Sequence, residues 1–61
     1  MNWNEVEIDT PVLVKNTEAA EWEKRRFACA INGVVYTWES NMTSKETKRV
    51  MWWNFAKLDK E

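Results

Sequence analysis

The sequence predicts a small, mainly β protein, with antiparallel strands arranged as a small barrel or a curved sheet. Two observations support this fold class. The dipeptide Asn32-Gly33 separates two runs of alternating apolar residues, and Asn-Gly favours the type I′ turn whose twist matches that of a β-hairpin. Two further runs, which begin at Pro11 and Val50, are rich in the β-branched and aromatic residues typical of strands. Strands are therefore expected near residues 11–15, 22–31, 34–39 and 50–58.

The first predicted strand begins at the single proline of the chain. Pro11 has no amide hydrogen to donate to a sheet, so it should stand at the first position of this strand or on an edge. Residues 12–15 are Val-Leu-Val-Lys. Because side chains alternate along a strand, either Leu13, or Val12 together with Val14, is expected to face the core.

The segment from Thr17 to Arg25 is compatible with two structures. Thr17 could cap a helix of good helix formers, in which Glu21 and Arg25 are four residues apart. The hairpin leaves room for only two turns of such a helix, which is too short to be stable without tertiary packing. The alternative is a strand that begins near Trp22 and continues to Ile31.

The Asn32-Gly33 turn fixes a register for the hairpin. A slip of one residue would exchange the two faces of the ladder, so each pairing is a specific prediction. One face should pair Phe27 with Trp38, Cys29 with Tyr36, and Ile31 with Val34. The opposite face should pair Arg26 with Glu39, Ala28 with Thr37, and Ala30 with Val35. We expect the first face to form the central wall of the core, joined by Trp53 and Phe55.

Residues 40–48 are polar and lack an apolar period, which predicts an exposed loop. Thr43 and Glu46 have the spacing of a capping box, so a helix that begins at Ser44 competes with the final strand at 50–58. We favour the strand because this run is rich in β-branched and aromatic residues, namely Val50, Trp52, Trp53 and Phe55.

As a strand, the final run is apolar on both faces. One face would carry Met51, Trp53, Phe55 and Lys57, and the other Val50, Trp52, Asn54, Ala56 and Leu58. A small barrel buries one side of a strand, so the second face is either covered by the N-terminal segment with Trp3 or left as a contact surface. We therefore predict a surface for another protein, or for a second copy of the chain, that includes Trp52, Trp22, Val50 and Leu58.

The composition argues against an enzyme and against any metal or cofactor site. The chain has 61 residues, enough for one domain over 1–61, and it contains no histidine and one cysteine. It lacks a nucleophile motif and a phosphate-binding loop, and a chain of this length rarely encloses a pocket. Cys29 is expected to be an inert buried thiol. No secretory signal or membrane span is visible, which predicts a cytoplasmic protein without a membrane partner.

The alternative function is binding of single-stranded nucleic acid through Trp22, Lys24, Arg25 and Arg26. Aromatic and basic residues interleaved on a β-surface stack bases and neutralise phosphates. However, nine basic against ten acidic residues give a net charge of −1, so no global field attracts a phosphate backbone. A solvated strand edge is the favoured interpretation of this run. A second basic cluster at 45–49 would strengthen the alternative if it shared the same surface.

Three segments resemble small uncharacterised proteins encoded by phages and prophages of Gram-positive bacteria. They are residues 9–14, 21–28 and 53–58, and the likeness includes the Asn-Gly turn with the Val-Val-Tyr-Thr-Trp run after it. The resemblance implies an intracellular phage or prophage product in the bacterial host cell, a class that often binds a host or phage protein. It supplies no site residue. The strand pattern predicts an SH3-like barrel or curved sheet of four to five strands, with at most one short helical turn. The apolar final run and the resemblance together lead us to expect a protein-interaction module or homo-oligomer.

Overall fold

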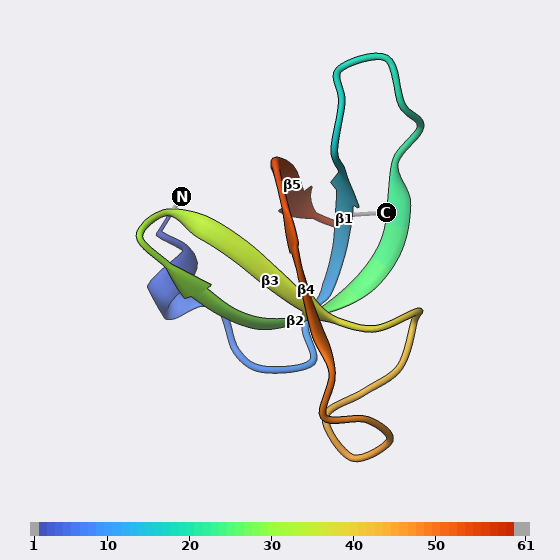
Figure 1. Ribbon diagram of the computed structural model, residues 1–61. Helices are drawn as coiled ribbons and strands as arrows, with labels where there is room; N and C mark the ends of the chain where they lie inside the picture. Colours follow the sequence, from blue (N-terminus) through green and yellow to red (C-terminus); the bar gives the residue numbers. More distant parts are fainter. Residues whose placement is uncertain (1, 60–61) are drawn as a thin grey trace.

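The computed structural model describes residues 2–59 and contains five antiparallel strands in one open sheet (Figure 1). A single turn of 3-10 helix, η1 (Trp3–Glu5), precedes them. The strands are β1 (Pro11–Lys15), β2 (Glu23–Ile31), β3 (Val34–Trp38), β4 (Val50–Trp53) and β5 (Phe55–Leu58). The mainly β prediction is confirmed, and the predicted strands at 11–15, 22–31 and 34–39 agree with β1, β2 and β3 to within one residue at each end.

The sheet is strongly curved because its two edge strands are neighbours in the sequence. The strand order is β4-β3-β2-β1-β5, and a single residue, Asn54, separates β4 from β5. The long strand β2 bends between its two halves, pairing first with β1 and then with β3 (Figure 1). The sheet therefore has two halves that share β2, and the curved-sheet form of the prediction is correct. The finer SH3-like assignment stays a prediction.

The hairpin between β2 and β3 has the predicted turn, with Asn32 at φ 52° and Gly33 at φ 80°. Next to the turn the register is also as predicted, since Cys29 pairs with Tyr36 and Ala30 with Val35. The register then shifts between Phe27 and Cys29, as in a β-bulge. Phe27 consequently pairs with Thr37 instead of Trp38 and moves to the opposite face.

Because of the bulge, most residues predicted for the core lie on the outer face of the sheet. Phe27 is buried, but the inner face of β3 consists of Val35 and Thr37. The five other residues predicted to form the central wall are half-buried or exposed on the outer face, namely Cys29, Ile31, Val34, Tyr36 and Trp38. The reason is space, since small side chains on the inner face leave room for the indole of Trp53. The predicted pair of Arg26 with Glu39 is also wrong, because Arg26 pairs with Pro11.

The core lies inside the curve of the sheet. Val12 and Val14 are fully buried, which selects the second of the two predictions made for β1. They pack with Phe27, Val35 and Trp53. The ring of Trp3 stacks on Phe27 with the centroids 5.6 Å apart and the planes 20° apart. The η1 segment therefore covers the core on the side of Phe27. It does not cover the second face of the final run, where Val50 and Trp52 stay exposed.

The final run is not one continuous strand. The amide of Asn54 donates to Asn16 Oδ1 (3.2 Å), and its side-chain Nδ2 donates to the Asn16 carbonyl (2.9 Å). This break changes the phase of alternation, so Trp53 faces inward in β4 while Ala56 and Leu58 pack against the core from β5. The core placement predicted for Phe55 is wrong, because this side chain is 37% exposed.

Neither of the competing helices forms. Residues 17–20 make a turn closed by the Ala20 amide and the Thr17 carbonyl (3.2 Å). Thr43 and Glu46 do form the predicted capping contact, in which the Thr43 amide donates to Glu46 Oε1 (2.9 Å), but the structure continues for one turn only. The loop of residues 39–49 and the loop of residues 16–22 lie at opposite ends of the molecule (Figure 1).

Candidate functional site

The outer side of the half-sheet β2-β3-β4 is apolar. Because Val35 and Thr37 face the core, Tyr36 faces outward, and its partners across the ladder are Cys29 on β2 and Trp52 on β4. By the same alternation the pair Ile31–Val34 lies on this side, and so does Val50. We call this surface the apolar face; it comprises Cys29, Ile31, Val34, Tyr36, Val50 and Trp52.

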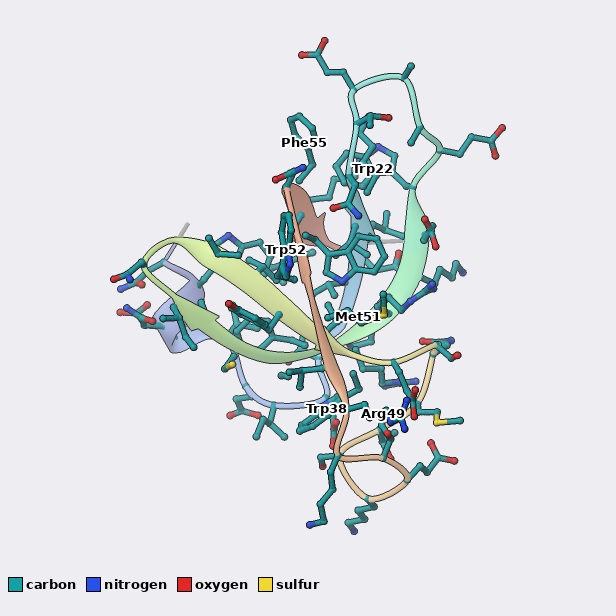
Figure 2. All side chains as sticks on the ribbon, in the orientation of Figure 1. Trp22, Trp38, Arg49, Met51, Trp52 and Phe55 are labelled. Carbon is teal, nitrogen blue, oxygen red and sulfur yellow. The ribbon has the colours of Figure 1, made fainter. Side chains whose placement is uncertain are left out.

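The apolar face is accessible to another molecule. Trp52 is 56%, Ile31 53% and Val50 44% exposed, whereas large contiguous apolar patches are rare on the surface of monomeric proteins. The face carries no charged side chain. It also adjoins a shallow hollow lined by Asn16, Val50, Met51 and Trp52. Figure 2 shows Trp52 and Met51 on the edge strand β4.

Two of the four residues predicted to bind a partner belong to the apolar face, and two do not. Trp52 and Val50 lie on it together. Leu58 packs against the core from β5, on the other half of the sheet. Trp22 precedes β2 and lies near Phe55, away from the loop that contains Arg49 (Figure 2).

Trp22 is held by two lysines. The Nζ atoms of Lys15 and Lys57 lie 4.6 Å and 4.5 Å from the centroid of its ring. Lys15 Nζ is also 5.7 Å from the ring of Phe55 and donates to the Glu18 carbonyl (2.9 Å). Such contacts between a cation and an aromatic ring contribute about 0.5–1 kcal/mol each at exposed sites. The arrangement concentrates positive charge around an exposed indole.

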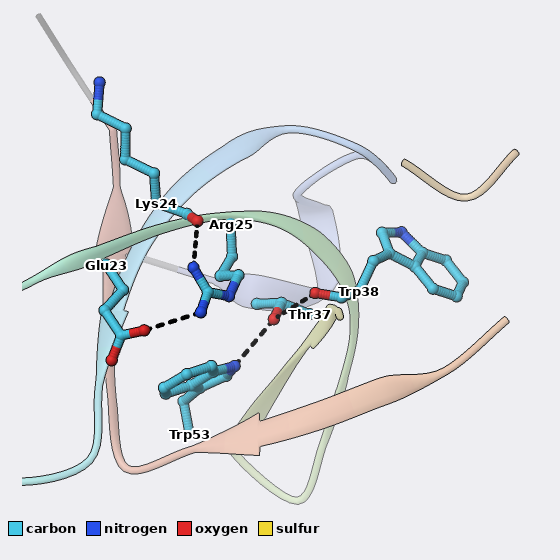
Figure 3. Close-up of polar contacts among 6 residues, drawn as sticks. All are labelled: Glu23, Lys24, Arg25, Thr37, Trp38 and Trp53. Atoms are coloured by element: carbon cyan, nitrogen blue, oxygen red, sulfur yellow. Dashed lines mark hydrogen bonds and ion pairs between the residues drawn. The ribbon is translucent and has the colours of Figure 1, made fainter. Parts of the chain in front are cut away.

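The basic run at 24–26 does not form one patch. Lys24 pairs with Leu13 on the outer side of the sheet, whereas Arg25 pairs with the buried Val12 and points inward. Arg25 Nη2 bonds Glu23 Oε1 (2.8 Å), and its guanidinium lies 5.4 Å from the ring of Trp53 (Figure 3). Arg25 therefore stabilises the fold and is not free to bind a phosphate.

Arg26 points away from Trp22 and toward the 39–49 loop, since it lines a hollow together with Asn41. Arg26 Nη1 donates to the Asp9 carbonyl (3.2 Å). Lys45 and Lys48 belong to the 39–49 loop, at the opposite end of the molecule from Trp22. Trp22 and the second basic cluster therefore do not share a surface, whereas Arg26 lies near the loop that carries this cluster.

Within residues 2–59 no group of three or more His, Cys, Asp or Glu side chains is placed to hold a metal ion. Asp9 accepts hydrogen bonds from the Ser44 hydroxyl and amide (both 2.8 Å), and these hold the pKa of its carboxyl below the ordinary value of 3.8.

In the described part of the chain, no helix is long and apolar enough to span a bilayer.

Sequence reasoning missed Lys15, Phe55 and Lys57 as surface neighbours of Trp22. The position of Lys15 could have been predicted from the alternation of β1, since burial of both valines places Leu13 and Lys15 on the outer side of the sheet. The phase of β5 could not be derived in the same way, because it depends on the break at Asn54.

Comparison with known proteins adds no relative. No protein-family model, no curated protein and no solved structure matches the chain.

Proposed function

We propose that this protein is an interaction module that associates with a second copy of itself through the apolar face. The observation that carries the proposal is the outward exposure of Trp52, Ile31 and Val50 on one uncharged surface. Tryptophan is among the residues that most often dominate the binding energy of protein interfaces. A surface of this kind loses water-exposed apolar area when another apolar surface covers it.

Charge favours a second copy as the occupant. A two-fold dimer brings the same patch of both subunits together, so the patch must be complementary to itself. An uncharged apolar face meets this requirement, whereas a charged face would repel its copy. The net charge of −1 also adds little repulsion between two molecules.

The edge strand β4 provides a further contact. One side of β4 pairs with β3, and its other side has no strand neighbour among residues 2–59. Free main-chain groups on a sheet edge are a template for pairing with another strand. We propose that β4 of each copy contributes this edge next to Trp52.

We also propose that the protein acts in the bacterial cytoplasm as an intracellular phage product.

Light scattering after size exclusion, over micromolar to millimolar concentrations, tests the proposal. We expect a dimer that dissociates on dilution. Trp52→Glu should weaken the dimer by roughly 30-fold or more, the effect typical of a central interface tryptophan. Ile8→Glu is the matched control, because Ile8 is 58% exposed but lies in the turn before β1; it should leave dimerisation unchanged.

Cys29 supplies a second measurement, since it is the one cysteine of the chain and is exposed on the apolar face. Its rate of alkylation should fall as the protein concentration rises, and should stay constant in the Trp52→Glu variant. A wild-type protein that remains monomeric at millimolar concentration would refute self-association. A dimer that Trp52→Glu does not weaken would show that another surface mediates it.

A further inference from the structure

A second surface lies on the outer side of the other half-sheet, β2-β1-β5. Val12 and Val14 are buried, so Leu13 and Lys15 face outward from β1. Across the ladder, Leu13 lies between Lys24 on β2 and Lys57 on β5, and Lys15 lies opposite Phe55. With Trp22 these residues form what we call the basic-aromatic face, which comprises Leu13, Lys15, Trp22, Lys24, Phe55 and Lys57.

Within the described part of the chain, the lysines of this face have no carboxylate partner. The one salt bridge among the described residues joins Arg25 to Glu23. Lys15 and Lys57 instead place their ammonium groups within 4.6 Å of the Trp22 ring centroid, so the two charges are about 9 Å apart at most. Nearly equal numbers of acidic and basic residues are present in the chain, yet the strand positions of this face carry three lysines and no acid.

The two aromatic rings are available for stacking. Trp22 and Phe55 are each 37% exposed, and Lys15 lies between them at 4.6 Å and 5.7 Å from their centroids. Contacts between a lysine and an aromatic ring are weak at exposed sites. The ammonium groups can therefore turn to an anionic group while a planar group takes their place on the ring.

We propose that the basic-aromatic face binds single-stranded nucleic acid. Bases would stack on Trp22 and Phe55, and Lys15, Lys24 and Lys57 would contact the phosphates. Every base has an aromatic face, so a site of this kind tolerates many sequences. A duplex keeps its bases stacked inside, and it offers nothing to the two rings. Arg25 takes no part, because it points to the core, and the proposal is independent of self-association through the apolar face.

Fluorescence anisotropy with a labelled oligothymidine tests the proposal. Affinity should fall as salt rises, with a slope of log K against log salt of about −2 for three lysine–phosphate contacts. Trp22→Ala should lower the affinity by roughly 5- to 150-fold, which corresponds to stacking of one base. Trp22 is exposed, so circular dichroism of this variant should match the wild type.

Two double variants separate the site from net charge. Lys15→Ala with Lys57→Ala should weaken binding and reduce the slope by about 1.4. Lys45→Ala with Lys48→Ala removes the same charge from the loop at the opposite end of the molecule and should leave most of the affinity intact.

Three results would overturn the proposal. The first is no binding at low salt. The second is equal loss of affinity in the two double variants, which would indicate non-specific attraction. The third is equal affinity for the oligothymidine, a duplex of the same length and a polyglutamate peptide, because charge alone would then explain binding and the rings would have no role.

Discussion

Thr37 is fully buried and polar, and its hydroxyl hydrogen-bonds both the indole of Trp53 in the core and the main chain of β3. It accepts a hydrogen bond from Trp53 Nε1 (2.9 Å) and donates to the Trp38 carbonyl (3.2 Å) (Figure 3). Buried polar groups are stable when they are hydrogen-bonded. The pair also explains why Trp53 can face inward from an edge strand. Its buried indole N–H needs an acceptor, and the Thr37 hydroxyl on the neighbouring strand β3 is that acceptor.

We predict that Thr37→Val destabilises the protein by about 1–3 kcal/mol, because it leaves the buried indole N–H of Trp53 without an acceptor. Valine has nearly the shape of threonine, so little of this loss would come from packing. Urea unfolding followed by circular dichroism measures the change in the free energy of unfolding.

A double-mutant cycle with Trp53→Phe provides the control for Thr37→Val. Phenylalanine has no N–H, so Thr37→Val should cost much less in that background, and the two changes should couple by more than about 0.5 kcal/mol. Additive effects would mean that the hydrogen bond contributes nothing measurable.

At the scale of the element, the turn of the hairpin depends on positive φ. Gly33 has φ 80°, and a Cβ added there would meet no atom within 4 Å. We predict that Gly33→Ala costs about 1–2 kcal/mol, because an L-residue is strained in this conformation even where space is free. Thermal unfolding of the variant measures the loss.

Chemical synthesis of the 61-residue chain with D-alanine at position 33 provides the control for the turn. A D-residue favours positive φ, so this version should be at least as stable as the parent. Equal destabilisation by L- and D-alanine would instead indicate a steric contact.

The elements themselves could be predicted from the sequence, since Asn32-Gly33 set the turn and the β-branched runs marked the strands. The sequence did not allow us to predict which side of each strand faces the core. The bulge between Phe27 and Cys29 reverses the alternation of β2, and the contact of Asn54 with Asn16 does the same between β4 and β5. Both depend on tertiary contacts that no local pattern contains. Trp52 and Val50 were nevertheless predicted as surface residues, because an apolar excess on both faces of one run is visible in the sequence.

At the scale of the whole molecule, the two halves of the curved sheet present different outer surfaces. The half with β3 and β4 is apolar and uncharged, and the half with β1 and β5 is basic and aromatic. Both surfaces include part of β2, which bends between the halves. One short chain can therefore present two different outer surfaces, since a curved sheet buries only its inner side.

Asp9, in the turn before β1, makes contacts with distant parts of the chain. Its carboxylate accepts from the Ser44 hydroxyl and amide, 35 residues along the chain, and its amide donates to the Phe27 carbonyl (2.8 Å). The turn before β1 is thereby tied to the 39–49 loop. Asp9 has φ 70°, a conformation that Asp and Asn tolerate better than most residues.

We predict that this contact makes stability depend on pH in the acid range. Ser44 lowers the pKa of the Asp9 carboxyl below 3.8 in the folded protein, so the unfolded chain binds a proton more readily. The stabilisation is complete above the unfolded value and is lost as pH falls through the lower folded value. Urea midpoints from about pH 6 to about pH 3 should therefore decrease less steeply for Asp9→Asn than for the wild type.

Asparagine keeps the backbone conformation and an oxygen for the Ser44 amide. Ser44→Ala should flatten the profile in the same way, because it removes the hydroxyl that contributes most to the shift. Parallel profiles for all three proteins would show that the Asp9–Ser44 contact does not control acid stability.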